Sequence, residues 1–572
     1  MNPITNRLLR LSALLVLGAV LLSACGGAQN GASSGQSGAM APADQQVLRL
    51  RINGEPKGID PQKASFTTEI SIAKQLFSSL FRYDENLQVV PDMAAEMPNV
   101  DNGGVSRDGK TYTIKLRSGL KWSDGQALTS QDIVYGFKRL LDPKTAAPYA
   151  SNFSAIAGAK EYSTAFGTKT APKTPSDAEL AALRDAVGVS ASGPSTVVFQ
   201  LKSPSASFVN QLALWAAAPV RQDVIEKYGD SWTEAGNLVG NGPFTLKEWV
   251  HNDHFTLEAN PNWHLGRPKL STVTIRIIED EVAAYASYLA GELDVAPVPP
   301  ANRKDVATAG SPLNAQLVRK PNLATQGLLF NTAEKPWDNV KVRQAFATAV
   351  SRQDYVDGAL QGAGEVTTSW LPPGMPGYDA TAGKQYSFDA AKAKQLLSDA
   401  GYANGAGFPK VTLLLKSNDA NKVLAAFLQE QFRTTLGIDI DVEMADTATY
   451  QSRFQKGQFS LTFGGWSADW PYPDNWLPEH FGSNGGFNVY HYSNAKLDDL
   501  FTKAAAEADP SKRLDLYGQA QKLVLDDAVI APVYNTETFV LVKPNVRDLQ
   551  VTGLDGYIRG DWNLWKTWIA KS

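Results

Sequence analysis

A single cysteine, Cys25, is the feature of this 572-residue chain that most constrains its fold. A chain with one cysteine can form no internal disulfide, so its fold must rest on hydrophobic cores. At roughly 100 to 200 residues per domain, the length predicts two or three folded units. The 43% of hydrophobic residues, the 20% of charged residues and the net charge of -4 are typical of a globular protein without a polyanion-binding surface. We therefore expect no nucleic-acid partner.

The first 24 residues have the pattern of a secretory signal peptide. Arg7 and Arg10 precede an apolar run over residues 11–22, and small residues separate that run from Cys25. The run is shorter than the roughly 18 residues that cross a bilayer, so no permanent membrane span is expected. The tetrad 22–25, Leu-Ser-Ala-Cys, resembles a bacterial lipobox, which implies cleavage before Cys25 and a lipid on its sulfur. Small and polar residues over 25–45 then predict a flexible tether.

From residue 46 onward, strand and helix patterns alternate along the chain. Alternating apolar and polar side chains predict strands over residues 47–52, 112–117, 196–201, 273–278 and 411–415. Apolar residues at helical spacing predict helices over residues 69–81, 340–350, 388–400 and 421–436. The last of these helices ends in Leu436-Gly437, and the alternating segment 437–443 follows it as in a helix-to-strand step. The patterns indicate an α/β fold.

The motifs that would indicate an enzyme or a metal site fail in their context. Residues 104–111 match the phosphate-loop pattern, but polar residues precede them and an alternating segment follows, so Asp108-Gly109 is predicted to be a turn. Residues 31–35 match the hydrolase elbow but lie in the tether. His251 and His254 have a spacing that binds metal on a helix, yet their flanks indicate a strand. We expect no enzyme activity, cofactor or metal site.

Several separated segments resemble a known family, and they occur in the family's order. They are Gly-Ile-Asp-Pro-Gln at 58–62, Asp-Gly-Lys-Thr-Tyr-Thr at 108–113, Leu-Arg-Ser-Gly-Leu-Lys-Trp-Ser-Asp-Gly at 116–125, Asn-Gly-Pro-Phe at 241–244, Asn-Pro-Asn-Trp at 260–263 and Val-Arg-Gln-Ala-Phe at 342–346. Together they resemble the dipeptide, oligopeptide and nickel family, family 5, of extracellular solute-binding proteins that serve ABC importers. The oligopeptide-binding lipoproteins of that family are the most similar members.

The resemblance implies a two-lobed, periplasmic-binding-protein-like α/β fold with an extra inserted domain and a cleft that closes by hinge motion. The implied first lobe is discontinuous, with residues 46–80, 195–320 and 535–572. Residues 81–194 would form the inserted domain and residues 321–534 the second lobe. The implied function is the capture of a peptide or another small solute and its delivery to a permease with ATPase subunits. Such a protein is expected to be a monomer, exported and lipid-anchored to the outer face of the cell membrane or the periplasmic side of the envelope.

The candidate ligand-binding residues also come from the resemblance. Trp466 to Asp469 match the family's W-x-x-D motif, in which the carboxylate binds the α-amino group of a peptide. Gly465 and Trp466 would offer a strand edge to the peptide backbone, which makes affinity independent of side-chain identity. Tyr149 and Tyr534 lie in stretches that resemble cleft-lining positions of the family.

One departure from the family leaves the ligand open. Family members hold the carboxylate of the peptide with basic residues before W-x-x-D and in an earlier loop, whereas residues 460–463 and 417–421 contain none. The length of the ligand is therefore undetermined at this point. An oligosaccharide binder, which would stack sugar rings on Trp466, Trp470 or Trp476, remains an alternative, as does a metal-chelate binder.

Overall fold

The computed structural model describes residues 38–571 apart from 168–171, 206, 484 and 508. The expected signal peptide, the expected lipidation site Cys25 and most of the expected tether lie outside the described residues. The chain divides into residues 1–39 and a compact unit of residues 40–572. Residues 40–45, which the sequence places in the tether, belong to the compact unit, because Met40 pairs with Ala570 and the amide of Ala41 donates to the carbonyl of Ile569 at 2.9 Å.

A four-stranded sheet brings the start of the compact unit together with a segment more than 200 residues later. Its order is β1 (Val47–Ile52), β9 (Thr272–Ile277), β8 (His254–Ala259) and β7 (Phe244–Val250), with β1 parallel to β9. Leu48, Leu50 and Ile52 of β1 are buried, as the alternating pattern predicts. The predicted strands over 47–52 and 273–278 are confirmed.

Helix α1 (Thr67–Leu76) ends five residues earlier than the sequence predicts. The backbone amides of Asn241 and Gly242 donate to the carbonyl oxygen of Leu76 at 3.1 and 2.9 Å. A distant segment thus takes the acceptor that the next helical turn would use, and Phe77 is extended. The chain continues into the hairpin of β2 (Phe81–Tyr83) and β3 (Val89–Pro91).

A three-stranded sheet holds the phosphate-loop-like segment. Its order is β4 (Thr111–Lys115), β6 (Thr196–Gln200) and β5 (Val189–Ala191), beside α2 (Ser130–Leu140), α3 (Ala159–Ser163) and α4 (Asp177–Asp185). Residues 106–109 form a turn in which Gly109 has a φ of +67°, and β4 rather than a helix follows. The predicted turn is confirmed, and the segment lacks the helix N-terminus that binds phosphate.

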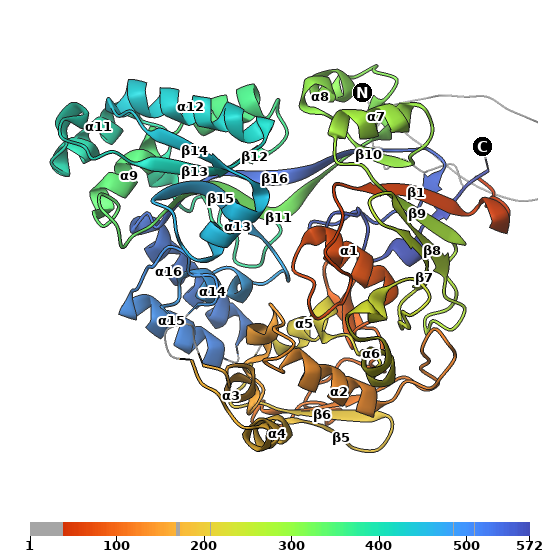
Figure 1. The fold of residues 1–572 in the computed structure, drawn as a ribbon. Helices are drawn as coiled ribbons and strands as arrows, with labels where there is room; N and C mark the ends of the chain where they lie inside the picture. Colours follow the sequence, from red (N-terminus) through yellow and green to blue (C-terminus); the bar gives the residue numbers. More distant parts are fainter. Residues whose placement is uncertain (1–37, 168–171, 206, 484, 508, 572) are drawn as a thin grey trace, which may run out of the picture. The chain divides into compact units, whose positions relative to one another are not determined.

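The largest sheet contains the β15 strand that leads to the candidate site. Its order is β10 (Val295–Pro297), β16 (Ile530–Val542), β11 (Leu317–Phe330), β15 (Leu461–Ser467), β13 (Thr412–Lys416) and β14 (Asp441–Ala445), and β12 (Glu365–Val366) also pairs with β16. Figure 1 shows α9 (Val340–Ala349), α11 (Ala390–Asp399) and α12 (Asp419–Leu436) beside the β13–β14 end, while β11 and β16 run on toward β10. β13 and β14 are parallel and Gly437 ends α12 with a φ of +71°, which confirms the predicted helix-to-strand step.

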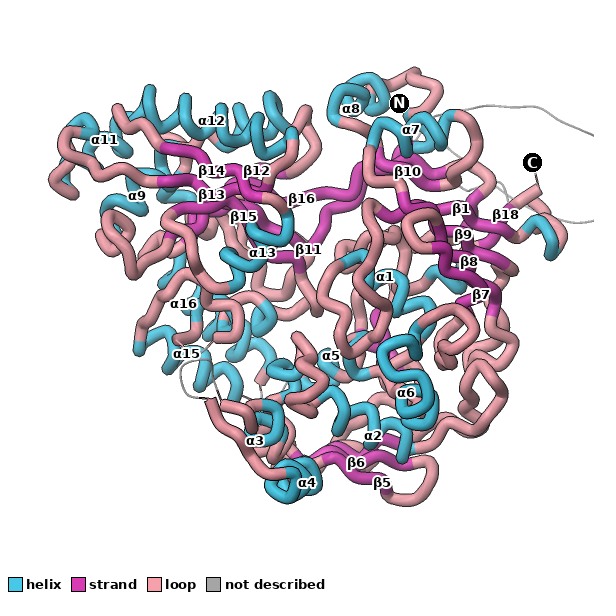
Figure 2. Tube along the Cα trace, viewed as in Figure 1, coloured by secondary structure: helices cyan, strands magenta, loops and turns pink. Residues whose placement is uncertain are grey.

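The remaining elements are short, apart from two long helices near the C-terminal end of the sequence (Figure 2). They are α5 (Phe208–Gln211), α6 (Gln222–Tyr228), α7 (Glu281–Leu289), α8 (Pro300–Ala307), α10 (Arg352–Asp354), α13 (Thr447–Gln455), α14 (Pro478–Phe481), α15 (Ala495–Ala506), α16 (Pro510–Asp526), β17 (Val546–Arg547) and β18 (Trp568–Ile569). Among the described residues, none of the helices combines the length and the apolar character that crossing a bilayer requires. Trp122 and Trp263 belong to the hydrophobic cores.

The contact that ends α1 can be tested at Gly242. A Cβ atom there would overlap the backbone between Leu76 and Phe77, which has no room to move. We expect Gly242→Ala to lower the free energy of unfolding by about 1 to 3 kcal/mol in denaturant titrations. Gly54→Ala is the matched control, because no atom lies within 4 Å of its added Cβ. Equal stability of the two variants would contradict the proposed cause of the helix end.

Candidate functional site

The candidate site is a cavity of about 220 Å³ that contains Asp469 in its wall. Helix α1, Trp215 and the segment between residues 553 and 562 line it together with β11 and residues 467–469 at the end of β15. The wall therefore comes from both halves of the chain.

The carboxylate of Asp469 is held in place by two side chains. The hydroxyl of Tyr149 donates to Oδ1 of Asp469 at 3.0 Å, and Nδ2 of Asn475 donates to its Oδ2 at 3.3 Å. The amide of Asp469 in turn donates to Oδ1 of Asn475 at 2.8 Å. The structure thus brings together two of the predicted site residues, Asp469 and Tyr149, which are 320 positions apart in the sequence.

The electrostatics of the site favour a cation. Burial raises the pKa of Asp469 to about 6, although the hydrogen bonds from Asn475 and Tyr149 act in the opposite direction. None of the ion pairs between described residues includes Asp469. Burial also raises the pKa of Glu479 to about 7, and the charges of Asp474 and Asp469 add to that shift. A cation beside these three carboxyl groups would stabilise their ionised forms.

Gly465 and Trp466 lie on β15, where they pair with Gln326 and Thr325 of β11. A Cβ atom at Gly465 would overlap the carbonyl oxygen of Thr325, so this close approach of the two strands requires glycine. On the other side of β15, the pairing with β13 includes only Leu461 and Thr462. Beyond Thr462, that edge of β15 pairs with none of the described strands, as a peptide-binding edge requires.

Trp466 packs on a buried histidine that the sequence analysis did not identify. The ring centroids of Trp466 and His480 are 4.5 Å apart, and Nε1 of Trp466 donates to Oδ1 of Asn475 at 3.2 Å. His480 is 4% exposed, and neither of its ring nitrogens has a hydrogen-bond partner among the described residues. Burial lowers its pKa to about 3, so the ring is neutral at physiological pH. Neither Asn475 nor His480 is part of a recognisable motif, because their roles depend on how the loop 468–480 folds back.

Tyr534 lies apart from the other candidates. It is on β16, and its ring is 5.8 Å from that of Tyr355 and 6.5 Å from that of Phe463. It does not line the cavity that contains Asp469.

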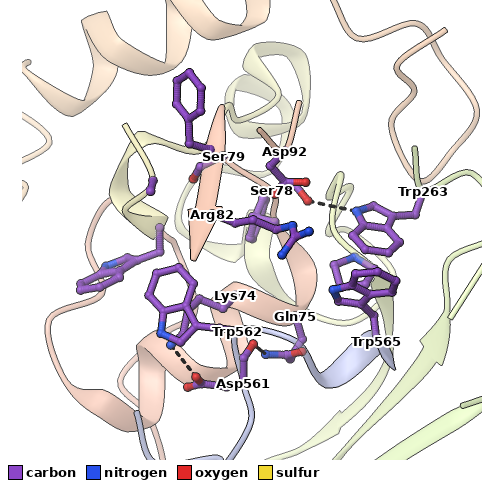
Figure 3. A pocket seen from close by; sticks show the side chains of 15 residues that line it. Lys74, Gln75, Ser78, Ser79, Arg82, Asp92, Trp263, Asp561, Trp562 and Trp565 are labelled. Carbon is purple, nitrogen blue, oxygen red and sulfur yellow. Dashed lines mark hydrogen bonds and ion pairs between the residues drawn. The ribbon is translucent and has the colours of Figure 1, made fainter. Parts of the chain in front are cut away.

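A second, smaller cavity of about 40 Å³ shares Lys74, Trp215 and Trp562 with the first. Figure 3 shows the Nζ of Lys74 pointing to Asp561, at 2.7 Å from its Oδ1, next to the ring of Trp562. The side chain of Lys74 is 6% exposed and that of Asp561 is fully buried. Lys74 is thus a cation that Asp561 already neutralises.

Comparison with known proteins decides the family. Residues 88–488 match the profile of the bacterial extracellular solute-binding proteins, family 5 Middle. The chain belongs to this family. The resemblance on which the expected fold rests is confirmed, and so is the two-lobed periplasmic-binding-protein fold itself.

Two relatives and one solved structure illustrate the similarity. The periplasmic murein peptide-binding protein MppA of Escherichia coli is 31% identical over 88% of this chain and 90% of its own. The probable deoxycholate-binding periplasmic protein YgiS of E. coli is 31% identical over 90% and 93%. The structure of E. coli MppA, a murein tripeptide-binding protein, superposes with a TM-score of 0.78 at 28% identity and covers 92% of this chain and 99% of that one. Further relatives at 27% to 29% identity are named oligopeptide- or dipeptide-binding proteins.

The structure also bears on the alternative ligands. Trp470 and Trp476 are only 1% and 0% exposed, so neither offers a ring face to the sugar of the oligosaccharide alternative, and of the three tryptophans only Trp466 is half-buried. Nε1 of Trp470 donates instead to Oδ1 of Asp474 at 2.6 Å. His251 and His254 each lie beside carboxylates, and no group of three or more potential metal-binding side chains occurs in the described part of the chain.

The neutral state of His480 gives a prediction about acid stability. The unfolded chain binds a proton at this histidine below its ordinary pKa of about 6.5, whereas the folded protein does so only near pH 3. Stability is therefore lost as the pH falls. Between pH 7 and pH 5, we expect the free energy of unfolding to fall by about 2 kcal/mol more in the parent than in His480→Phe.

Denaturant titrations at both pH values measure this difference, and any packing cost of the phenylalanine cancels because it is the same at each pH. His254→Phe is the control with the opposite sign, since a hydrogen bond to Asp253 raises the pKa of His254. The same pH dependence in the parent and in His480→Phe would show that His480 is not held neutral.

Proposed function

We propose that this protein captures peptides outside the cytoplasm and delivers them to the permease of an ABC importer. The observation that carries the proposal is the Asp469 carboxylate, which is fixed by Tyr149 and Asn475 in a cavity wall and belongs to no ion pair of the described residues. The α-ammonium group of a peptide provides the missing positive charge. The names of MppA and of the oligopeptide-binding relatives support a peptide as the ligand.

The energetics of such a contact favour a specific role for Asp469. A buried ammonium group loses its water, and a fixed carboxylate replaces that water with charge-assisted hydrogen bonds. Removal of one partner from such a pair costs about 2 to 5 kcal/mol. Deoxycholate, the ligand in the name of YgiS, has no ammonium group and therefore could not form this contact with Asp469.

The backbone of the peptide would add to β15. Beyond Thr462 no described strand pairs with this edge, so an extended chain could add there and Trp466 would lie beside it. Because backbone hydrogen bonds do not depend on side chains, this mode accommodates peptides of different sequence. Tyr149 would position Asp469, whereas Tyr534 would contact only a ligand that extends toward Tyr355.

The proposed domains follow from the resemblance with one adjustment. The first lobe takes residues 46–80, 201–320 and 535–572, the inserted domain residues 81–200 and the second lobe residues 321–534. The end of the inserted domain moves from 194 to 200, because β6 (Thr196–Gln200) pairs with β4 and β5. Strands β11 and β16 pass between the two lobes of this division and would act as the hinge.

The remaining parts of the proposal concern the setting of the protein. Signal peptide cleavage before Cys25 would leave a lipid anchor at the outer face of the membrane, and residues 26–39 would connect it to the compact unit. The protein would act as a monomer without cofactor and would perform no chemistry. Contacts of the ligand with both lobes would stabilise the closed cleft, so that the permease distinguishes loaded from empty protein.

Asp469→Asn tests the central contact. We expect the variant to lose the increase in melting temperature that a di- to octapeptide library gives the parent. Without ligand, the variant is expected to be more stable than the parent by about 1 to 2 kcal/mol at pH 7, because ionisation of a carboxyl group with a raised pKa opposes folding.

Asp101→Asn, an exposed loop position, is the matched control and should keep the response to peptides. The measurement is thermal unfolding with each peptide, and with oligosaccharides and metal chelates in parallel. If peptides stabilise Asp469→Asn as much as the parent, Asp469 does not bind the ammonium group. If only sugars or chelates stabilise the parent, the peptide assignment fails.

The pH dependence of peptide affinity provides a separate test. The contact needs an ionised Asp469, whose pKa in the free protein is about 6, and a protonated peptide amine, whose pKa is about 8. Below pH 6 the affinity is expected to fall about tenfold per pH unit, so that binding at pH 5 is about tenfold weaker than at pH 7. Calorimetric titrations across pH 5 to 9 should show a maximum between the two pKa values. An affinity that stays constant from pH 7 to pH 5 would contradict the role of Asp469.

A further inference from the structure

The cavity that contains Asp469 has four ionisable side chains with formal charge in its wall: Lys74, Asp469, Asp555 and Arg559. Lys74 forms an ion pair with Asp561 at 2.7 Å. The carboxyl group of Asp555 is occupied by hydrogen bonds within its own loop. Two charges of opposite sign, Asp469 and Arg559, therefore remain available to a ligand.

Arg559 is held at the cavity by a rigid loop. The amides of Thr552 and Gly560 donate to Oδ2 of Asp555 at 2.9 and 2.7 Å, and the amide of Gly556 donates to Asp561 at 3.0 Å. These bonds fix the backbone on both sides of Arg559. Two neighbouring carboxyl groups, those of Asp555 and Asp561, thus hold this loop in one conformation.

The guanidinium group itself has few partners. Nη1 of Arg559 donates to the carbonyl of Gly556 at 3.2 Å, and none of the ion pairs between described residues includes Arg559. The side chain is half-buried and also lines a neighbouring cavity of about 120 Å³. A guanidinium group offers five N–H donors in a planar fork that matches a carboxylate. Most of these donors are thus free to bind an anion.

We propose that Arg559 binds a carboxylate of the ligand in the same cavity in which Asp469 binds its ammonium group. This inference rests on the proposed function and specifies the ligand further. Residues 417–421 and 460–463, where the resemblance leads us to expect a basic residue for the carboxylate of the peptide, contain none. Arg559 supplies a basic group from the C-terminal segment instead. The preferred ligand is then a short zwitterionic peptide or a peptide with an acidic residue near its N-terminus.

Arg82 is another cation near this cavity, and its surroundings make it less suited to the role. It lines the cavity of about 40 Å³, where its Nη1 donates to Oδ1 of Asn563 at 3.1 Å and its guanidinium lies 5.7 Å from the ring centroid of Trp565 (Figure 3). That space is about the size of one or two water molecules rather than of a peptide terminus.

The test uses calorimetric titration of the protein with di-, tri- and tetra-alanine, each as the free acid and as the C-terminal amide. The amides of Ala-Glu and Ala-Glu-Ala test an acidic side chain as the source of the carboxylate. We expect the free acids, or the glutamate-containing amides, to bind the parent about 10- to 100-fold more tightly than the alanine amides. In Arg559→Gln this preference should disappear, while the affinity for the alanine amides stays the same.

Arg559→Lys keeps the charge but not the planar fork, and it should retain part of the preference. Arg107→Gln is the matched control. It removes an exposed arginine that is distant from Arg559 in the sequence, and it should leave all the affinities unchanged. If only the free acids bind the parent more tightly than the alanine amides do, Arg559 binds the C-terminal carboxylate. If the glutamate-containing amides also bind more tightly, Arg559 binds the side-chain carboxylate as well. If peptides bind but the preference is absent or survives in Arg559→Gln, the inference about Arg559 is wrong while the peptide function stands. If no peptide binds the parent, the proposed function fails and the inference fails with it.

Discussion

The hydrogen bond between Tyr149 and Asp469 is the interaction on which the candidate site depends. It joins a residue of the inserted segment to the loop after β15, across 320 positions of sequence. Asn475 completes the arrangement, because it binds the amide, the carboxylate and the neighbouring Trp466 at once. One short loop thereby positions both the charge and the aromatic ring, and the β15 strand beneath it is fixed to β11 by the close approach at Gly465.

The site lowers the stability of the protein that contains it. Asp469 and Glu479 are carboxyl groups with raised pKa values, and His480 is a buried ring without hydrogen-bond partners among the described residues. Each would be better solvated in the unfolded chain. Large apolar cores offset these costs, with Trp370 packed edge to face against both Trp476 and His480. Such an accumulation of unfavourable polar groups at one place is typical of a binding site.

The elements that could be predicted from the sequence are those that local pattern controls. Strand β1 and helix α9 begin where their patterns begin, and Gly437 ends α12 as a helix-ending glycine should. Helix α1 is different, because its end depends on Asn241 and Gly242, which no local pattern connects to Leu76. In the site, the family motif identified Asp469, but its partner Asn475 and the free guanidinium of Arg559 depend on loops that fold back from a distance. The burial of Trp470 and Trp476 was likewise hidden, since an aromatic residue has the same sequence signal in a core and in a binding wall.

Under the proposals made here, the placement of Asp469 and Arg559 would link ligand recognition to the motion of the family fold. Under the proposed domain boundaries, Asp469 belongs to the second lobe and Arg559 to the first. A ligand that carries both charges would contact the two lobes at its two ends, so its binding free energy depends on the distance between them. A ligand that carries only the ammonium group would contact Asp469 in any position of the lobes. Because a ligand shifts a conformational equilibrium only by its differential affinity for the two states, the zwitterion would drive closure and the singly charged ligand would do so weakly. The same two contacts, at Asp469 and Arg559, would then both select the ligand and stabilise the closed arrangement of the lobes.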